Sequence, residues 1–165
     1  MKKETKTILG ITYITGYEYD KVGSITAVIY PSGRRIEYAY NQINLPTGVT
    51  ARMNATMTLA NNLTYDPASN LTSMTFGSGL IQNWPYDVNN RIKTIQVPNI
   101  LDIAYTFDPV GNITAIADQL DATKSKTYTY DALDRLSSAN GPWGSLTWTY
   151  DADGNRLTQG NGMNY

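Results

Sequence analysis

One short pattern recurs along this 165-residue chain: a large aromatic residue followed by Asp or Asn. The aromatic residue of the pattern stands at Tyr19, Tyr40, Tyr65, Tyr86, Phe107, Tyr130 and Tyr150. Successive copies lie 20 to 25 residues apart, most often 21. A fixed period in this range is typical of repeat architectures, in which one small unit is stacked many times. The repeat therefore limits the fold to an array of similar units.

Each copy has the residue pattern of a β-hairpin. In the clearest copy, TYTYDALDRL, Tyr128 and Tyr130 are two residues apart and so point to the same face of a strand. Asp131 follows that strand, and an alternating run begins at Leu136 after the turn. The copies YEYDKVGSI and WTYDADGNRL follow the same order. One repeat is thus predicted to be one antiparallel hairpin plus the reversal into the next.

The aromatic positions are predicted to form a ladder on one face of the sheet. Two residues before the repeated aromatic, large side chains recur, while the position between them is mostly small or polar. The predicted ladder comprises Tyr17, Tyr19, Tyr38, Tyr40, Tyr65, Trp84, Tyr86, Tyr105, Phe107, Tyr128, Tyr130, Trp148 and Tyr150. Aliphatic residues are expected opposite these rings, at Ile25, Leu71, Ile92, Ile113, Leu136 and Leu157. Cross-strand pairs of this kind contribute roughly 0.2 to 1 kcal/mol each.

The residue after the aromatic is predicted to form the turn. Asp and Asn side chains accept hydrogen bonds from backbone amides two residues on and close an Asx turn. The predicted turn residues are Asp20, Asn41, Asp66, Asp87, Asp108, Asp131 and Asp151. Three residues further on, the chain places types that readily adopt a left-handed backbone, namely Gly23, Asn44, Asn90, Gly111, Asp134 and Gly154, with Ser69 as the exception.

Some copies depart from the pattern. The second has Leu45 and Pro46 after its turn, and the seventh is expected to carry one extra turn residue before Leu157. Pro85 lies inside a predicted strand, where it cannot donate a hydrogen bond, so we expect a bulge or a missing bond there.

The wider spacings place two longer loops and suggest how the chain is divided. Longer loops are expected at residues 50–61, with a short helix as the alternative, and at residues 118–126. Residues 1–12 are expected to be a charged leader and a partial repeat, and residues 13–165 a single array of about seven repeats.

Composition favours an all-β protein and excludes several functions. The chain has 13 tyrosines, 16% charged residues and a net charge of −1. That balance gives no electrostatic basis for binding nucleic acid or an anionic membrane. No run of about 18 apolar residues predicts a membrane helix, and the first 16 residues show no Sec signal. The absence of Cys excludes a disulfide-stapled fold but leaves the compartment open.

The sequence predicts no enzyme, metal site or cofactor. With neither His nor Cys, the chain offers no Ser-His triad, thiol nucleophile or zinc site. The aspartates recur at every turn, which favours a structural role over a unique catalytic site. Asp151 to Asn155 faintly resembles a calcium loop, but Gly162 stands where a bidentate Glu is required. Four Asn-x-Thr sequences, at Asn54, Asn62, Asn70 and Asn112, are interpreted as strand starts rather than glycan acceptors.

The units YDALDRLSSANGPWGSLTWTYDADGNRL and FDPVGNITAIAD resemble the tyrosine-aspartate (YD) repeats of the RHS family, which also occur in bacterial toxin complexes and in teneurins. The resemblance covers residues 13–157. It implies a long sheet of consecutive hairpins that curls or spirals, like a β-solenoid, into a shell around a toxic domain or into an extracellular barrel. The family's downstream features, including its self-cleaving region and variable toxin domain, are absent from this sequence.

Three functions follow as expectations. The first is a non-catalytic segment of an RHS-type shell, secreted or on the cell surface, whose partners are further repeats and an enclosed toxin. The second is a unit that assembles through its edge strands into an extracellular fibre. The third is a choline- or carbohydrate-binding module, for which Trp84, Trp143 and Trp148 are the candidate residues.

Overall fold

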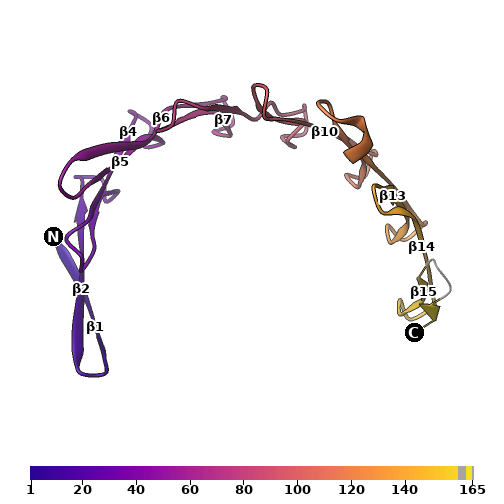
Figure 1. Ribbon diagram of the computed structural model, residues 1–165, viewed down its shortest axis with the longest axis horizontal. Helices are drawn as coiled ribbons and strands as arrows, with labels where there is room; N and C mark the ends of the chain where they lie inside the picture. The colour runs from indigo at the N-terminus through magenta and orange to yellow at the C-terminus, as the bar shows by residue number, and fades with distance from the viewer. Residues whose placement is uncertain (160–162, 165) are drawn as a thin grey trace. The chain divides into compact units, whose positions relative to one another are not determined.

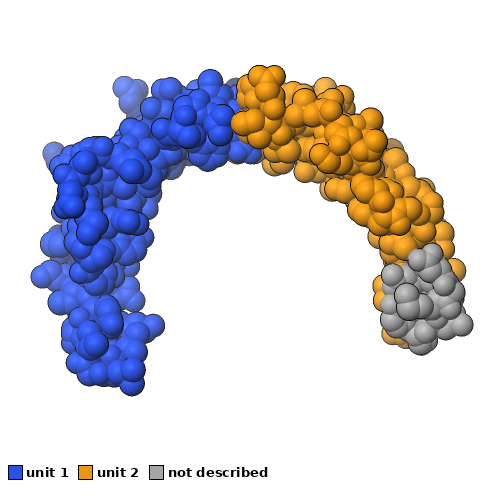
Figure 2. Space-filling view, viewed as in Figure 1, with its two compact units in different colours: residues 1–83 blue, residues 84–165 orange. Residues whose placement is uncertain are grey.

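The computed structural model describes residues 1–159, 163 and 164, and it consists almost entirely of antiparallel strands. It divides into two compact units, residues 1–83 and residues 84–165 (Figure 2). In each unit every strand pairs with the strands adjacent to it in the sequence, as can be followed in Figure 1. The predicted all-β array of consecutive antiparallel hairpins is thereby confirmed.

The first unit holds eight strands. They are β1 (Lys2–Ile8), β2 (Ile11–Tyr19), β3 (Ile25–Ile29), β4 (Arg35–Tyr40), β5 (Pro46–Arg52), β6 (Thr56–Tyr65), β7 (Leu71–Phe76) and β8 (Ile81–Asn83). Each pairs with the next in antiparallel register.

The second unit repeats this arrangement. Its strands are β9 (Thr94–Val97), β10 (Leu101–Phe107), β11 (Ile113–Asp118), β12 (Lys126–Tyr130), β13 (Leu136–Gly141), β14 (Gly144–Tyr150), β15 (Arg156–Gln159) and β16 (Met163–Asn164). A single 3₁₀ turn, η1 (Ala122–Lys124), lies between β11 and β12. No helix in the described part of the chain is long and apolar enough to span a bilayer.

Each sheet is one layer thick. The buried apolar residues among those described are Ala27, Ala60, Val97 and Ala139, and no large side chain in this part of the chain is fully buried. Strands β12 and β14 alternate between half-buried rings and exposed polar residues; in β12, Tyr128 and Tyr130 are half-buried and Thr129 is exposed. Other strands, such as β7 and β11, are half-buried along their whole length. Stability therefore comes from strand pairing and contacts between neighbouring hairpins rather than from a central core.

The amino-terminal segment differs from the expected leader. Residues 2–8 form β1, an ordered strand that pairs along its whole length with β2, from Lys2 opposite Tyr17 to Ile8 opposite Ile11. The two strands are joined by Leu9 and Gly10, both with positive φ, which is the geometry of a two-residue hairpin turn. All seven residues of β1 are exposed, as expected for a charged segment.

The predicted loop at residues 50–61 was wrong, and so was its helical alternative. This segment extends β5 and β6, which are joined by a short turn at residues 53–55. The extra length lengthens the strands instead of the loop. The second predicted loop is confirmed, because β11 ends at Asp118 and the chain passes through η1 before β12 begins at Lys126.

The interruption expected at Pro85 is confirmed. β8 is only three residues long, and after it Tyr86 makes an isolated bridge with Ile92 instead of a continuous ladder. Pro85 still accepts, because its carbonyl receives a hydrogen bond from the Lys93 amide at 2.8 Å. The first unit ends at Asn83, two residues before this proline.

Candidate functional site

The turn that follows the repeated aromatic is built around one carboxylate. In the clearest copy, Asp131 Oδ1 accepts hydrogen bonds from the backbone amides of Leu133 and Arg135, at 2.9 and 3.0 Å. The Asp131 amide donates to the Arg135 carbonyl at 2.8 Å, and the Asp134 amide donates to the Asp131 carbonyl at 3.1 Å. Side chain and backbone together close a five-residue turn from 131 to 135.

All seven copies close the turn in the same way. The side-chain Oδ1 of the Asp or Asn accepts from the amide four residues on, over 2.8 to 3.0 Å. Asn41 serves as well as the aspartates because its amide oxygen accepts from Leu45 at 2.9 Å. The residues that accept are Asp20, Asn41, Asp66, Asp87, Asp108, Asp131 and Asp151.

The third residue after the Asp or Asn has a left-handed backbone in every copy. Its φ lies between 59° and 107° at Gly23, Asn44, Ser69, Asn90, Gly111, Asp134 and Gly154. Ser69, whose type did not favour this conformation, has φ 66°. The hydrogen bonds of Asp66 on either side hold it there: Ala68 and Asn70 both donate to Asp66 Oδ1 at 2.9 Å.

The next residue was missed by the sequence reasoning. In five copies it is Asn or Arg, and its side chain donates to the second oxygen of the turn aspartate over 2.7 to 3.0 Å. The donors are Asn70, Arg91, Asn112, Arg135 and Asn155. The signal was present, because aligning the seven copies shows Asn or Arg repeated in this column.

These donors lower the pKa of the turn carboxylates. The backbone amide of Arg135 and the Arg135 side chain lower the pKa of Asp131 below its ordinary value, against the effect of desolvation. The Asn70 and Asn155 side chains do the same to the pKa of Asp66 and of Asp151. The carboxylates are therefore held charged as acceptors, which is the opposite of what a general acid requires.

A register shift occurs where the repeated aromatic meets its partner strand. In six copies the pairing slips by one residue just before the aromatic, which is the pattern of a β-bulge. The slip places the aromatic opposite the residue six positions later, as with Tyr19 and Ile25 or Tyr130 and Leu136. These pairs lie at the mouth of each turn.

The seventh copy needs a correction. Its turn has the same length as the others, because Asp151 accepts from Asn155 and the register places Tyr150 opposite Arg156. Arg156 thus occupies the aliphatic position, and Leu157 is 46% exposed. The supposed extra residue came from aligning the copies on the next aliphatic side chain instead of on the turn.

The tyrosine hydroxyls connect successive hairpins. Tyr40, Tyr65, Tyr130 and Tyr150 each donate to a backbone carbonyl in the preceding hairpin, over 2.7 to 2.9 Å. The acceptors are Ile25, Pro46, Ile113 and Leu136, the residues that lie opposite the aromatic of that preceding hairpin. Desolvation raises the pKa of Tyr130 and Tyr40. The ladder is therefore joined through hydroxyls as well as through ring packing.

Two arginines add a second link in the second unit. The Arg135 guanidinium lies 4.6 Å from the centre of the Tyr150 ring, and its Nη1 donates to the Asp151 carbonyl at 3.3 Å. Arg91 lies in the same way 4.3 Å from the centre of the Phe107 ring. Because each arginine also binds the aspartate of its own turn, it joins two consecutive turns. Ring stacking is limited to Tyr105 and Phe107 among the described residues, with centroids 6.5 Å apart.

The opposite face of the first unit carries a charged network. Arg35 forms a bidentate pair with Glu18 at 2.6 and 2.7 Å and also binds Glu37 at 2.7 Å. Hydrogen bonds from Arg35 lower the pKa of Glu18 and of Glu37, while the two carboxylates raise the pKa of Arg35. This network ties β2 to β4 across β3, where the buried Ala27 leaves room for it.

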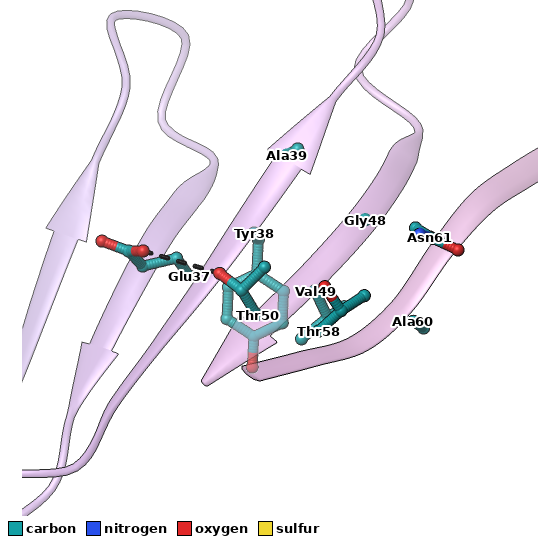
Figure 3. A pocket seen from close by; sticks show the side chains of 9 residues that line it. All are labelled: Glu37, Tyr38, Ala39, Gly48, Val49, Thr50, Thr58, Ala60 and Asn61. Atoms are coloured by element: carbon teal, nitrogen blue, oxygen red, sulfur yellow. Dashed lines mark hydrogen bonds between the residues drawn. The ribbon is translucent and has the colours of Figure 1, made fainter. Parts of the chain in front are cut away.

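Shallow hollows lie along the strands of the array. One hollow, of about 210 Å³, lies over β4, β5 and β6 (Figure 3). Glu37 and Tyr38 point to opposite sides of β4, and the Thr50 hydroxyl donates a hydrogen bond to the Glu37 carboxylate at 3.5 Å. Gly48 also lines this hollow, and a Cβ at position 48 would lie 3.5 Å from the Ala60 carbonyl oxygen. Among the described residues no cluster of acidic side chains is arranged to hold a metal ion.

The three tryptophans differ in exposure. Trp84 and Trp148 are half-buried, whereas Trp143 is 49% exposed at the tip of the β13–β14 hairpin. The Trp143 ring lies against Gly141, where a Cβ would come within 2.9 Å of it.

The sequence is similar to a toxin subunit. Toxin subunit YenC1 of Yersinia entomophaga is 30% identical over 103 residues, which cover 50% of this chain and 11% of that protein. No family model matches the chain.

Solved toxin structures share the fold. A chain of the Photorhabdus luminescens Tc holotoxin pore superposes with a TM-score of 0.82 at 22% identity, over 90% of this chain and 9% of that chain. The crystal structure of TcdB2-TccC3 gives a TM-score of 0.83 at 22% identity, over 90% of this chain and 9% of that one. This chain therefore spans about a tenth of the length of the proteins it matches.

Proposed function

We propose that the chain is a non-catalytic wall segment of an RHS-type shell built from YD repeats, which encloses a toxin and is exported or displayed at the cell surface. The observation that carries the proposal is the single-layer sheet. Its hairpins are joined by the same contacts from one repeat to the next, and no core is formed among the described residues. Such a sheet is suited to form a wall, because it is stabilised by contacts between neighbouring repeats and not by a compact core.

The similarity to a toxin subunit also supports the proposed wall function. YenC1 matches this chain over about a tenth of its own length, as a repeated segment of a longer wall would. The turn aspartates support a structural role because all six accept backbone amides and five of them also accept from an Asn or Arg side chain. An array of this kind acts by enclosure and requires further repeats on both sides.

The test uses the complete polypeptide that carries this sequence, purified from its natural source. Cryo-electron microscopy is expected to show hollow particles whose wall contains the array, and limited proteolysis is expected to spare an enclosed segment. A variant that breaks the wall, Gly77→Ala, should expose that segment, whereas Gly48→Ala should not. Solid particles, or an equally protected segment in the Gly77→Ala variant after its wall has been shown to open, would reject enclosure.

A fibre is the second candidate, favoured by one observation. All seven residues of β1 are exposed, and its outer edge pairs with no strand among the described residues. An open edge is a template for pairing with another chain. The three lysines of β1 oppose such pairing. Light scattering of this chain over a concentration series, with negative-stain microscopy, decides the point: micrometre rods support the fibre, and monomers at high concentration eliminate it.

A further inference from the structure

Two hollows meet on the aromatic face of the first unit. One, of about 470 Å³, is lined by Tyr13, Tyr30, Pro31, Ser32, Arg34 and Ile36. The other, of about 210 Å³, is lined by Arg34, Ile36, Ala51, Arg52, Met53, Ala55, Met57 and Leu59. Arg34 and Ile36 line both hollows, which therefore adjoin, and we name the pair of hollows the Arg34 groove.

The strand register explains why these residues share a face. Val28 lies opposite both Tyr17 and Ile36, and Ala51 lies opposite both Ile36 and Met57. Residues directly opposite in an antiparallel pair share a face. Tyr13 joins them because it stands four residues before Tyr17 in β2, where the register shows no slip.

Several exposed side chains that line the groove are apolar or aromatic. Tyr13, Tyr30, Met53, Met57 and Leu59 are 41, 45, 59, 64 and 39% exposed. Contiguous exposed apolar patches mark interaction sites more often than isolated ones do. The two methionines can adapt to different side chains because their chains are flexible and polarizable.

The charged side chains that line the groove are all positive among the described residues. Arg34 stands where the two hollows meet, and it forms no ion pair within the described part of the chain. Arg52 at the rim is 3.5 Å from Glu37, and no acidic residue among those described lines either hollow. A ligand that fills the groove gains most if it places a negative group between two apolar groups, because Arg binds carboxylates with directed hydrogen bonds.

We propose that the Arg34 groove binds an extended peptide segment in which a carboxylate side chain is flanked by two apolar side chains. In an extended chain, every second residue points to the same side. The fitting pattern is therefore apolar, any, acidic, any, apolar, with the acid on Arg34 and one apolar side chain in each hollow. This site goes beyond the proposed wall function, since a wall requires no peptide site.

The test measures binding of a fluorescein-labelled peptide to the full chain by anisotropy. The probe contains Leu-Ser-Glu-Ser-Phe, and the matched peptide has Lys in place of Glu. The Glu peptide is expected to bind about tenfold more tightly than the Lys peptide, the size of one charge-assisted hydrogen bond. Arg34→Gln should remove that preference, and Met57→Ala should weaken both peptides.

Matched variants separate the groove from general effects. Lys3→Gln removes a cation from the opposite face of β1, and Val22→Ala removes an apolar group that is 77% exposed in a distant turn. Both should bind the Glu peptide as the parent chain does, and circular dichroism should show all variants folded. Equal binding of the two peptides, binding unchanged by Arg34→Gln, or no binding would overturn the proposal. So would dimerisation through this face, or binding only to vesicles of anionic lipid.

Discussion

The carboxylate of Asp131 has two functions. One oxygen accepts two backbone amides and shapes the turn, while the other binds Arg135 at 2.7 Å. Arg135 then reaches the next turn and lies over its aromatic ring. Through Arg135, Asp131 thus stabilises the contact between its own hairpin and the next one.

Replacing Asp131 with Ala should therefore destabilise the β12–β13 hairpin and abolish no activity. The Ala variant loses the two hydrogen bonds that Asp131 accepts from backbone amides and also its contact with Arg135. Asp131→Asn should be milder, because Asn41 shows that an amide oxygen closes the same turn. Urea unfolding followed by circular dichroism measures both, with Leu133→Ala, exposed by 70%, as the control in the same turn. A loss of stability as large for Leu133→Ala would contradict the role of the carboxylate.

The link between hairpins is tested by Tyr130→Phe. This change removes the hydroxyl that donates to the Ile113 carbonyl at 2.9 Å and leaves the ring in place. The expected loss is about 1 kcal/mol in the free energy of unfolding, the net value of a typical hydrogen bond. Tyr19→Phe is the control, because Tyr19 is 39% exposed and its hydroxyl has no carbonyl partner among the described residues.

Phe107 provides the reverse experiment. It occupies the repeated aromatic position but has no hydroxyl, so Phe107→Tyr adds a donor where other copies have one. If the new hydroxyl reaches the preceding hairpin as in Tyr130, the free energy of unfolding should rise by up to about 1 kcal/mol. A lower stability would show that the Arg91 contact requires the unsubstituted ring.

At the scale of the strands, bulges and close approaches set the register. β6 contains Asn62 with φ 52°, and its pairing with β7 slips between Asn61 and Thr64. Next to this irregularity Gly77 comes so close to β6 that its amide donates to the Leu59 carbonyl at 2.8 Å. A side chain at position 77 would have no space.

Gly77→Ala should consequently be among the most damaging single substitutions in the chain. A Cβ at this position would overlap the Thr58 carbonyl oxygen. The strands must separate locally, and overpacking of this kind costs about 1 to 3 kcal/mol. Gly48→Ala is the matched control, because its Cβ would meet the Ala60 carbonyl at an ordinary 3.5 Å. Thermal unfolding of the two variants measures the difference, and equal melting temperatures would refute the close approach.

At the scale of the whole molecule, each element is supported by its neighbours in sequence. The strands pair only in sequence order within each unit, and no core spans either of them in the described residues. Repeat arrays of this type open locally. Hydrogen exchange read by mass spectrometry should therefore show that Gly77→Ala loses protection in β6 and β7 and leaves β12 and β13 unchanged. A uniform loss in both units would indicate a cooperative single body.

Acid should destabilise the array. Side-chain and backbone donors lower the pKa of Asp66 and Asp151 below the ordinary 3.8, and Arg35 lowers the pKa of Glu18 below 4.5. A carboxylate whose pKa is lower in the folded state stabilises it above the unfolded pKa and ceases to do so as the pH falls through the folded value. Stability should be nearly constant down to about pH 5 and decline below about pH 4. Asp66→Asn should make that decline shallower in urea titrations. A free energy of unfolding that rises on acidification would contradict the stabilising role of these carboxylates.

The sequence by itself determined the repeating hairpin, because alternation, turn residues and period are local properties. The Asp and Asn turns and the left-handed residues such as Gly23 and Gly154 depend on four or five consecutive residues, which the chain displays seven times. The error in the seventh turn, at Arg156, came from choosing the wrong column when the copies were aligned.

Only the tertiary structure decided the exact register of the strands and the contacts between neighbouring hairpins. Three features arise from contacts between segments that the local pattern does not encode. They are the pairing of β1 with β2, the extension of β5 and β6, and the need for glycine at position 77. The same holds for the Tyr130 hydroxyl on Ile113 and for the Arg34 groove. A bulge shifts the register by one residue, and that shift decides which donor meets which acceptor across the sheet.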